Sequence, residues 1–274
     1  MSVAVTESPR PIFDDVAPQV WRRAATAEMP AVRKVPEESP VAFVYQGASY
    51  AVMMATPANL EDFALGFSLN EGVVRSADEI ETLDIVQTEN GILLRMVLAA
   101  AAANAFWERR RYLSGPSGCG LCGLESLAQA VRPPHRVDGG LRVFGEAICA
   151  AMATLPERQP MNRLTGALHA AAFWIPDDGM VAVREDVGRH NALDKLTGAI
   201  SAAGLPAVHG AVLLTSRVSV EMVQKTASLG AAVLVAVSAP TALALRAADA
   251  AGITLIAVAR QDGFETFTHP QRIL

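Results

Sequence analysis

The second half of the chain alternates short apolar runs with helix-like patterns, and this rhythm constrains the fold more than any other feature. The apolar runs lie at 167–175, 211–215, 231–237 and 253–259. Strands buried on both faces of a parallel sheet read as continuous apolar runs, so the pattern predicts a central, mostly parallel sheet. Helices are expected at 144–155, 191–203, 221–229 and 241–251, and a hairpin partner for the first strand at 180–185. Together these elements predict a three-layer α/β sandwich with right-handed crossovers.

The first half shows a different pattern, in which hairpins alternate with helices. Strands are expected at 41–45 and 49–54 around Gln46-Gly47, and at 82–88 and 92–98 around Asn90-Gly91. Thr56-Pro57 predicts the start of a helix with Thr56 as its cap, and an alanine-rich helix is expected from about residue 99 to residue 114. We therefore expect a small α+β domain before the sandwich.

Three regions follow from these patterns. Residues 1–38 are rich in proline and charged residues and predict a partly ordered arm. Residues 39–137 form the small α+β domain, which ends in a cysteine-containing loop, and residues 138–274 form the α/β sandwich.

Cys119 and Cys122 are separated by two residues and surrounded by glycines. The small neighbours leave the sulfur atoms uncovered, and a helix that begins near Cys122 would favour its thiolate. Such a pair serves thiol–disulfide exchange, half of a zinc site, or a persulfide carried on one cysteine, and it also occurs simply in turns. The sequence of the loop alone leaves these alternatives open.

Composition excludes several classes of protein. The chain has 274 residues, of which 51% are hydrophobic, so a large core is possible. A net charge of −5 argues against a broad nucleic-acid surface. Three cysteines are too few for a disulfide framework and favour a reducing, cytoplasmic environment. The apolar stretch at 230–245 is broken by Pro240, so no membrane span is expected.

Polar side chains follow the expected strands of the second half. The segment 184–195 contains Arg189 and His190, which could hold phosphate, and Asp186, which could orient them. Hydroxyl groups and arginines recur at 215–219, 238–241 and 260–263. Each segment alone is more typical of a helix cap than of a binding site, but the carboxyl ends of parallel strands share one edge of a sheet. Together they predict a site for a large, phosphate-bearing ligand.

The order of the elements resembles the cytidine-deaminase-like fold, whose zinc chemistry can be tested on the residues. A zinc deaminase needs His-x-Glu at the first helix and Pro-Cys-x-x-Cys at the second. Here the first site reads His190-Asn191-Ala192, and the second reads Ser216-Arg217-Val218-Ser219 without a cysteine. The sequence therefore predicts the scaffold without the zinc site, and no structural metal.

These residues together resemble the FdhD family of formate dehydrogenase accessory sulfurtransferases, from about residue 38 to the C-terminus. The segments that carry the resemblance are Met53-Met54-Ala55-Thr56-Pro57, 60–67, Gly118-Cys119-Gly120-Leu121-Cys122-Gly123, Thr165-Gly166 with His169, 184–192 with Asp194-Lys195, Ser216-Arg217 and Thr268-His269-Pro270.

The resemblance implies a sulfur carrier. A cysteine desulfurase would pass sulfur to Cys119, which would hold it as a persulfide beside Cys122. The protein would then deliver the sulfur to the molybdenum cofactor, in its bis-guanine-dinucleotide form, before the cofactor enters formate dehydrogenase. A homodimer is also implied. The residues expected to bind the cofactor are Val258, Ala259, Arg260, Gln261, Asp262 and Gly263 by resemblance, and His169, Arg189, His190, Asn191, Ser216 and Arg217 from the polar strand ends and the shared motif.

Three other readings compete with the sulfur carrier. A dithiol–disulfide oxidoreductase that cycles Cys119 and Cys122 would explain the loop, but not the polar strand ends. A cofactor-binding chaperone would explain the strand ends and leave the cysteines incidental. A zinc site built from the two cysteines and two histidines lacks a second ligand motif. Sulfane sulfur on the purified protein would distinguish the carrier from all three.

Overall fold

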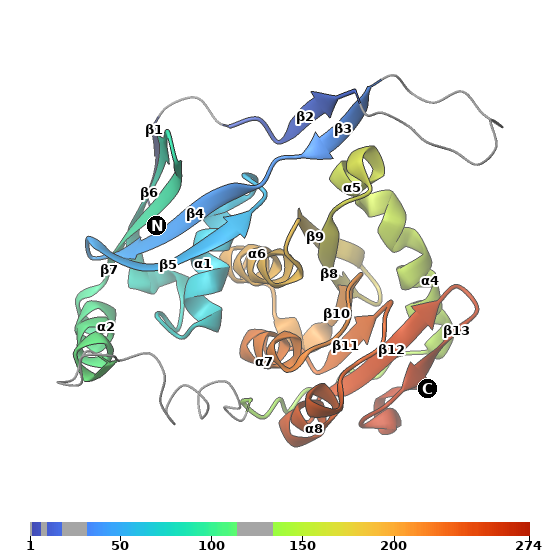
Figure 1. The fold of residues 1–274 in the computed structure, drawn as a ribbon. Coiled ribbons are helices and arrows are strands. Elements are labelled where there is room, and N and C mark those ends of the chain that lie inside the picture. The colour runs from blue at the N-terminus through green and yellow to red at the C-terminus, as the bar shows by residue number, and fades with distance from the viewer. Residues whose placement is uncertain (1, 7–9, 18–31, 114–133) are drawn as a thin grey trace.

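The computed structural model describes residues 2–6, 10–17, 32–113 and 134–274, which form a mixed α/β structure built on two large sheets (Figure 1). One sheet has five strands in the order β1-β6-β7-β4-β5, and the other has six in the order β13-β12-β11-β10-β8-β9. A two-stranded ribbon, β2-β3, accompanies them.

The six-stranded sheet holds the apolar runs predicted from the sequence. Its strands β10, β11 and β12 are parallel to one another, whereas β8, β9 and β13 run antiparallel to their neighbours. The strands are β8 (His169–Ile175), β9 (Gly179–Asp186), β10 (Ala211–Leu214), β11 (Val233–Ala236), β12 (Thr254–Arg260) and β13 (Gly263–Thr266).

Helices cover both faces of this sheet, which confirms the predicted three layers. Val212 and Leu214 point to one face and pack with α6 (Arg189–Ala202), α7 (Val220–Leu229) and α8 (Ala242–Ala251). Ala211 and Leu213 point to the other face and pack with α4 (Gly145–Thr154). Adjacent residues of one strand thus belong to two separate cores, because side chains alternate across a sheet. The closer likeness to cytidine deaminases stays a prediction.

The five-stranded sheet packs two helices against one face. Its strands are β1 (Ser2–Thr6), β4 (Ser39–Tyr45), β5 (Ala48–Ala55), β6 (Ile80–Thr88) and β7 (Gly91–Leu98), and its helices are α1 (Leu60–Asn70) and α2 (Ala100–Leu113). Phe43 on β4 stacks on Phe67 of α1, with 3.9 Å between ring centroids. Both predicted hairpins are confirmed by the pairing of β4 with β5 and of β6 with β7.

The start of α1 differs from the prediction. The helix begins at Leu60, and Asn59 in a left-handed conformation precedes it. Thr56 does not cap the helix, because its hydroxyl accepts a hydrogen bond from the N–H of Val187 and its own N–H donates to Asp186. The hydroxyl and the N–H of Thr56 therefore form tertiary hydrogen bonds, and the hydroxyl does not cap the helix as the local sequence pattern predicts.

The N-terminal region contains strands that the sequence pattern does not reveal. The strand β1 pairs with β6 in a parallel register, and β2 (Phe13–Val16) pairs with β3 (Arg33–Pro36). The guanidinium group of Arg33 donates to the carbonyl of Thr165 at the end of α5 (Pro160–Thr165). These segments contact both sheet regions, although their charged sequence resembles a flexible tail. The remaining short helices are η1 (Ala77–Glu79), η2 (Leu155–Arg158), η3 (Ala207–His209) and η4 (Pro270–Arg272).

The two regions join where α1 lies against α6 (Figure 1). Glycines make the close approach possible. A β-carbon placed on Gly66 would lie 1.7 Å from the carbonyl oxygen of Asp194, and one placed on Gly198 would lie 1.9 Å from that of Asp62. Each overlap is with the backbone of the facing helix, so neither can be relieved by a side-chain rotation.

We expect Gly66→Ala to lower the free energy of unfolding by about 2–3 kcal/mol, because the two helices must separate to admit the methyl group. Alanine favours a helix by roughly 1 kcal/mol over glycine, so the overlap must outweigh this gain. Urea denaturation provides the measurement. The control is Gly145→Ala in α4, where the added carbon would meet Phe264 at 3.5 Å, an ordinary contact. Equal stability of the two variants would contradict the packing described here.

Candidate functional site

The polar strand ends predicted from the sequence do meet at one edge of the six-stranded sheet. The N–H of Thr215 donates to Ala170, beside the start of β8. The N–H of Val237 donates to Leu214, and the N–H of Val258 approaches the carbonyl of Ser238 at 3.4 Å. The segments that follow β10, β11 and β12 are therefore neighbours in space.

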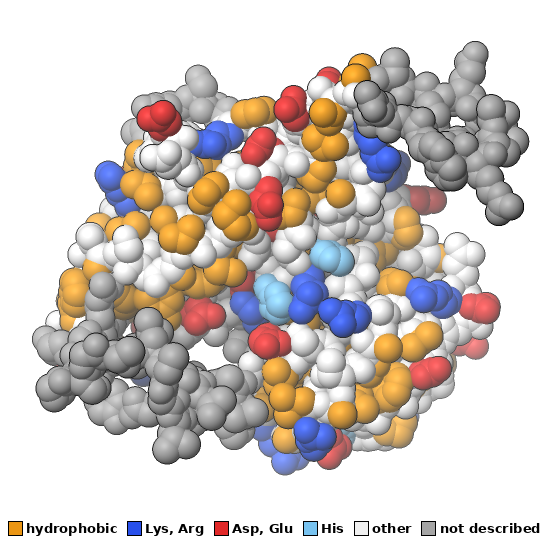
Figure 2. Space-filling view, viewed as in Figure 1, with side chains coloured by type: hydrophobic (Ala, Val, Ile, Leu, Met, Phe, Trp, Pro, Cys, Tyr) orange, Lys and Arg blue, Asp and Glu red, His pale blue; other side chains and the backbone are white. Residues whose placement is uncertain are grey.

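The first turn of α6 adds basic groups at this edge. His169, the first residue of β8, pairs in register with Asp186, the last residue of β9. Gly188 follows and leads into α6 at Arg189 and His190. Figure 2 shows histidine side chains gathered with lysine or arginine side chains near the centre of the face seen in Figure 1. The edge thus brings together several side chains of the types that bind anions in proteins.

Arg189 carries the most informative unsatisfied group. Its Nε is buried and has no hydrogen-bond partner within the described residues. A buried guanidinium nitrogen without an acceptor is costly, so an acceptor from a ligand or from water is expected. Guanidinium groups bind phosphate oxygens through charge-assisted hydrogen bonds. Arg189 is therefore suited to hold an oxyanion.

The pKa values of both neighbouring histidines are lowered. Burial lowers the pKa of His169, and the positive charge of Arg189 lowers it further. Burial likewise lowers the pKa of His190, with Arg189 and Lys225 adding to the effect and Glu221 opposing it. The Nε2 of His190 lies 4.0 Å from a Glu221 carboxylate oxygen. An anion bound here would reverse the effect of Arg189 and favour the charged histidines.

The free protein is expected to lose stability as the pH falls below the ordinary histidine value of 6.5. The histidine pKa values are lower in the folded chain, so the unfolded chain binds protons first and is favoured by acid. Thermal midpoints between about pH 8 and about pH 5.5 measure this effect. His190→Gln should flatten the profile. His209→Gln serves as the control, because the exposed His209 lies in η3, before the start of β10 and away from the edge where β10 ends. A wild-type profile identical to that of His190→Gln would contradict the assignment.

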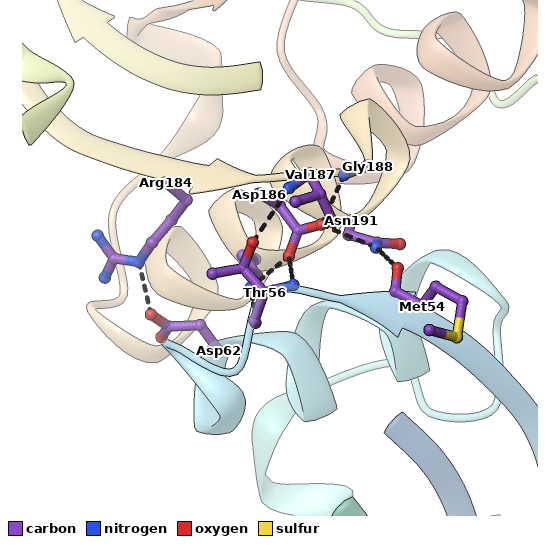
Figure 3. A network of polar contacts seen from close by, with 9 residues as sticks. Met54, Thr56, Asp62, Arg184, Asp186, Val187, Gly188 and Asn191 are labelled. Carbon is purple, nitrogen blue, oxygen red and sulfur yellow. Dashed lines mark hydrogen bonds and ion pairs between the residues drawn. The ribbon is translucent and has the colours of Figure 1, made fainter. Parts of the chain in front are cut away.

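Asn191 lies inside the protein and its exposed fraction is 2%. Its amide nitrogen donates to the carbonyl of Met54 at 2.8 Å and to Asp186 at 2.9 Å (Figure 3). Both amide hydrogens therefore serve contacts within the chain, and the Met54 contact joins the two sheet regions. The structure separates Asn191 from Arg189 and His190, although the three are consecutive in sequence.

The segment after β10 also divides into buried and exposed parts. Ser216 is buried, and its hydroxyl donates to the carbonyl of Arg217 at 3.1 Å. The side chain of Arg217 is exposed. Arg217 is thus available to a ligand, whereas the Ser216 hydroxyl has a partner within the turn.

The stretch assigned to the cofactor by resemblance begins with an unusual backbone. Val258 has a φ of 53°, a left-handed conformation that is costly for a β-branched residue. A β-bulge between Ala257 and Arg260 accompanies it. Such strain is concentrated at functional sites. Ala259 is buried and Gly263 closes the turn into β13, so Arg260, Gln261 and Asp262 are the exposed side chains of the stretch.

Three further predictions concern the cysteine pair, metal binding and membrane spans. Cys119 and Cys122 lie outside the described residues, so their geometry stays a prediction. In the described part of the chain there is no cluster of three or more histidine, cysteine or acidic side chains that could hold a metal ion. No helix in the described ranges is both long and apolar enough to cross a membrane.

The sequence pattern missed the buried polar network that holds the start of α6 (Figure 3). Both side chains of the Lys195–Asp186 ion pair are fully buried, and Thr56 completes the contact from the other sheet region. Lys195 stands in the motif at 184–195, but nothing in the sequence shows that Thr56, 139 residues earlier, is its partner.

Comparison with known proteins agrees with this architecture. The model of the FdhD/NarQ family matches residues 36–274. The chain is 52% identical over 259 residues to the sulfur carrier protein FdhD of Agrobacterium fabrum, covering 93% of this chain and 96% of the relative. It is 49% identical over 271 residues to the protein of the same name from Cupriavidus necator, covering 98% and 93%.

A solved structure shares the fold. It is a protein from Desulfotalea psychrophila, described as a candidate formate dehydrogenase accessory protein, with a TM-score of 0.71 and 24% identity. The match covers 96% of this chain and 100% of that one. From the family model and the two close relatives together, this chain belongs to the FdhD/NarQ family.

Proposed function

We propose that this protein is a sulfur carrier in the maturation of formate dehydrogenase. It takes persulfide sulfur from a cysteine desulfurase and transfers it to the molybdenum cofactor, in its bis-guanine-dinucleotide form, before that cofactor enters the dehydrogenase. The names of the close relatives support the carrier role. The proposal includes action in the cytoplasm, and assembly as a homodimer.

The observation that carries the cofactor half of the proposal is the buried Nε of Arg189, which has no hydrogen-bond partner in the parts of the chain that the structure describes. It lies at a sheet edge with His169 and His190, and the exposed Arg217 follows the neighbouring strand. A guanine dinucleotide brings a diphosphate, and these basic groups supply the charge that a diphosphate needs. The strained Val258 stretch at the next strand end is a second contact of the same proposal.

The sulfur half rests on Cys119 and Cys122. In loading, the Cys119 thiolate attacks the outer sulfur of the desulfurase persulfide, and the desulfurase cysteine leaves as a thiolate. In delivery, the Cys122 thiolate attacks the inner sulfur of the Cys119 persulfide and a disulfide forms. The outer sulfur leaves as hydrosulfide, which the cofactor accepts. The two thiols supply the two electrons that reduce the sulfane sulfur, and the protein acts as a sulfurtransferase.

Loading is tested by the intact mass of the protein after incubation with a cysteine desulfurase and cysteine. A gain of one sulfur atom that cyanide removes supports a persulfide carrier. A protein that only cycles between dithiol and disulfide, as in the oxidoreductase alternative, would gain no sulfur. Absence of the added sulfur on repeated loading would therefore reject the carrier.

Cofactor binding is tested with guanosine diphosphate, a fragment of the cofactor, by calorimetry without added metal. We expect binding that weakens with salt, and a loss of about tenfold or more in Arg189→Ala, because a charged hydrogen bond to phosphate is removed. Arg142→Ala, on an exposed arginine before α4 on the opposite side of the sheet, is the control and should bind normally. No binding by the wild-type protein at about millimolar ligand, the weak end of the affinity scale, would show that the site is wrongly assigned.

A further inference from the structure

The turn between β9 and α6 is held by a carboxylate whose two oxygens are both fully used. Asp186 accepts hydrogen bonds through Oδ1 from the N–H of Gly188 at 2.7 Å and from Asn191 at 2.9 Å. Its Oδ2 accepts from the N–H of Thr56 at 3.0 Å and from Lys195 at 2.5 Å. The side chain is completely buried, so water does not compete for these donors.

Thr56 belongs to the first sheet region, yet each of its polar groups contacts the second (Figure 3). Its hydroxyl accepts from the N–H of Val187 at 3.1 Å. Its N–H donates to Asp186, and its carbonyl accepts from Lys195 at 2.9 Å. A residue that lies 131 positions before Val187 in the sequence therefore fixes the backbone of this turn.

The turn leads directly into the anion-binding residues. The N–H of Val187 is held by Thr56, the N–H of Gly188 is held by Asp186, and Arg189 and His190 follow at once. Gly188 is packed tightly, because a β-carbon there would lie 2.7 Å from the Asn191 amide nitrogen. A shift of the turn would thus move the first turn of α6 and the basic side chains that it carries.

We propose that Thr56 is a positioning residue for the anion site, so that the first sheet region sets the affinity of the second for phosphate. This inference rests on the proposed binding of cofactor phosphates by Arg189 and His190. Thr56 acts through the hydrogen bond of its hydroxyl to Val187 and through Asp186, and it does not touch the ligand itself. The hydroxyl group of Thr56 thereby links cofactor binding in the second region to the first region, the part of the chain that leads to the cysteine loop.

The sharpest test removes only the hydroxyl of Thr56. Thr56→Val keeps the shape of the side chain but leaves the N–H of Val187 without an acceptor. We expect the affinity for guanosine diphosphate to fall by about fivefold, the equilibrium equivalent of one ordinary hydrogen bond. Thr56→Ser restores the hydroxyl and should restore the affinity. Thr226→Val is the matched control, because Thr226 is equally buried and its hydroxyl donates to the carbonyl of Met222 within α7.

A second measurement does not depend on the ligand. Hydrogen exchange at the backbone amides of residues 187–190 should be faster in Thr56→Val than in the wild type, and normal in Thr56→Ser and Thr226→Val. Faster exchange in Thr56→Val, together with no binding of guanosine diphosphate by the wild-type protein, would keep the positioning role and reject the proposed ligand. Unchanged exchange together with unchanged affinity in Thr56→Val would overturn the positioning role. An equal loss of affinity in Thr226→Val would also overturn it, because removal of a buried hydroxyl far from the turn would then have the same effect as removal of the Thr56 hydroxyl.

Discussion

Replacing Cys119 by serine is expected to reduce sulfur delivery to background, because a serine hydroxyl cannot hold sulfane sulfur. Cys122→Ser should still load sulfur, since Cys119 makes the first attack, but it should deliver less. The loss is measured as formate dehydrogenase activity in cells whose own carrier gene is deleted and replaced by the variant. Cyanide-labile sulfur on each purified variant reports loading separately from delivery.

The chain offers a matched control for this experiment in Cys149. This free cysteine lies on α4, on the face of the six-stranded sheet opposite α6, and it is partly buried. Cys149→Ser also removes one thiol, but the proposed transfer does not use it, so loading and delivery should both persist. Full maturation of formate dehydrogenase by Cys119→Ser would reject the persulfide role. Loss in all three variants alike would point to a general sensitivity to thiol removal.

The strands of the second half could be predicted because their signal is local. Runs such as 211–215 and 231–237 are apolar throughout, and only a strand covered on both faces buries every residue of such a run. The carboxyl ends of these strands share one edge of the sheet, and this rule predicts that Ser216, Arg217 and the stretch after β12 lie close together. The placement of Arg189 and His190 at the start of α6 followed from the same rule.

Features that depend on a distant partner could not be predicted. Thr56 followed by proline is a typical helix start, but its hydroxyl is taken by Val187. Asn191 is predicted to bind the cofactor beside two basic residues, and its neighbours in sequence do not reveal that its amide nitrogen donates to the carbonyl of Met54 across the region boundary. Gly66 and Gly198 each read as a weak helix residue, and only their close approach to the facing helix explains them. In each case the residue contacts a partner more than 100 positions away in the sequence, and its immediate neighbours do not reveal that partner.

Breaking the ion pair between Lys195 and Asp186 is expected to destabilise the protein strongly. Both side chains have no exposed area, and their charged atoms are 2.5 Å apart. Asp186→Asn leaves the lysine charge buried with the carbonyl of Thr56 and the ring of Phe63, whose centroid is 5.3 Å away. We expect the free energy of unfolding to fall by about 3–5 kcal/mol at neutral pH, the usual cost of an uncompensated buried charge. Urea denaturation measures it.

The pH dependence of this variant separates a charge effect from a packing effect. Burial lowers the pKa of Lys195 below its ordinary value, and the Asp186 carboxylate is the main group that opposes this. Without the carboxylate the folded chain should release the lysine proton more readily than the unfolded chain. Between those two pKa values the unfolded chain binds more protons, so the stability of Asp186→Asn relative to wild type should recover as the pH rises. A deficit that is constant from neutral to alkaline pH would mean that lost hydrogen bonds, and not the charge, cause the destabilisation.

A double-mutant cycle makes the last distinction. Lys195→Met removes the charge but leaves Asp186 with three N–H donors, from Gly188, Asn191 and Thr56, so its cost should be the smaller of the two. The double variant should be more stable than the sum of the single effects predicts, because the second change removes the charge that the first left unpaired.

The control pair is Arg184 and Asp62, which also joins the two regions, but its side chains are 25% and 18% exposed. Asp62→Asn should cost only about 1 kcal/mol, because partly hydrated charges lose less when separated. If breaking either pair lowers the free energy of unfolding by the same amount, the contacts across the junction contribute alike. If only the buried pair gives a large loss, the turn before α6 is the point at which the two regions are fixed together.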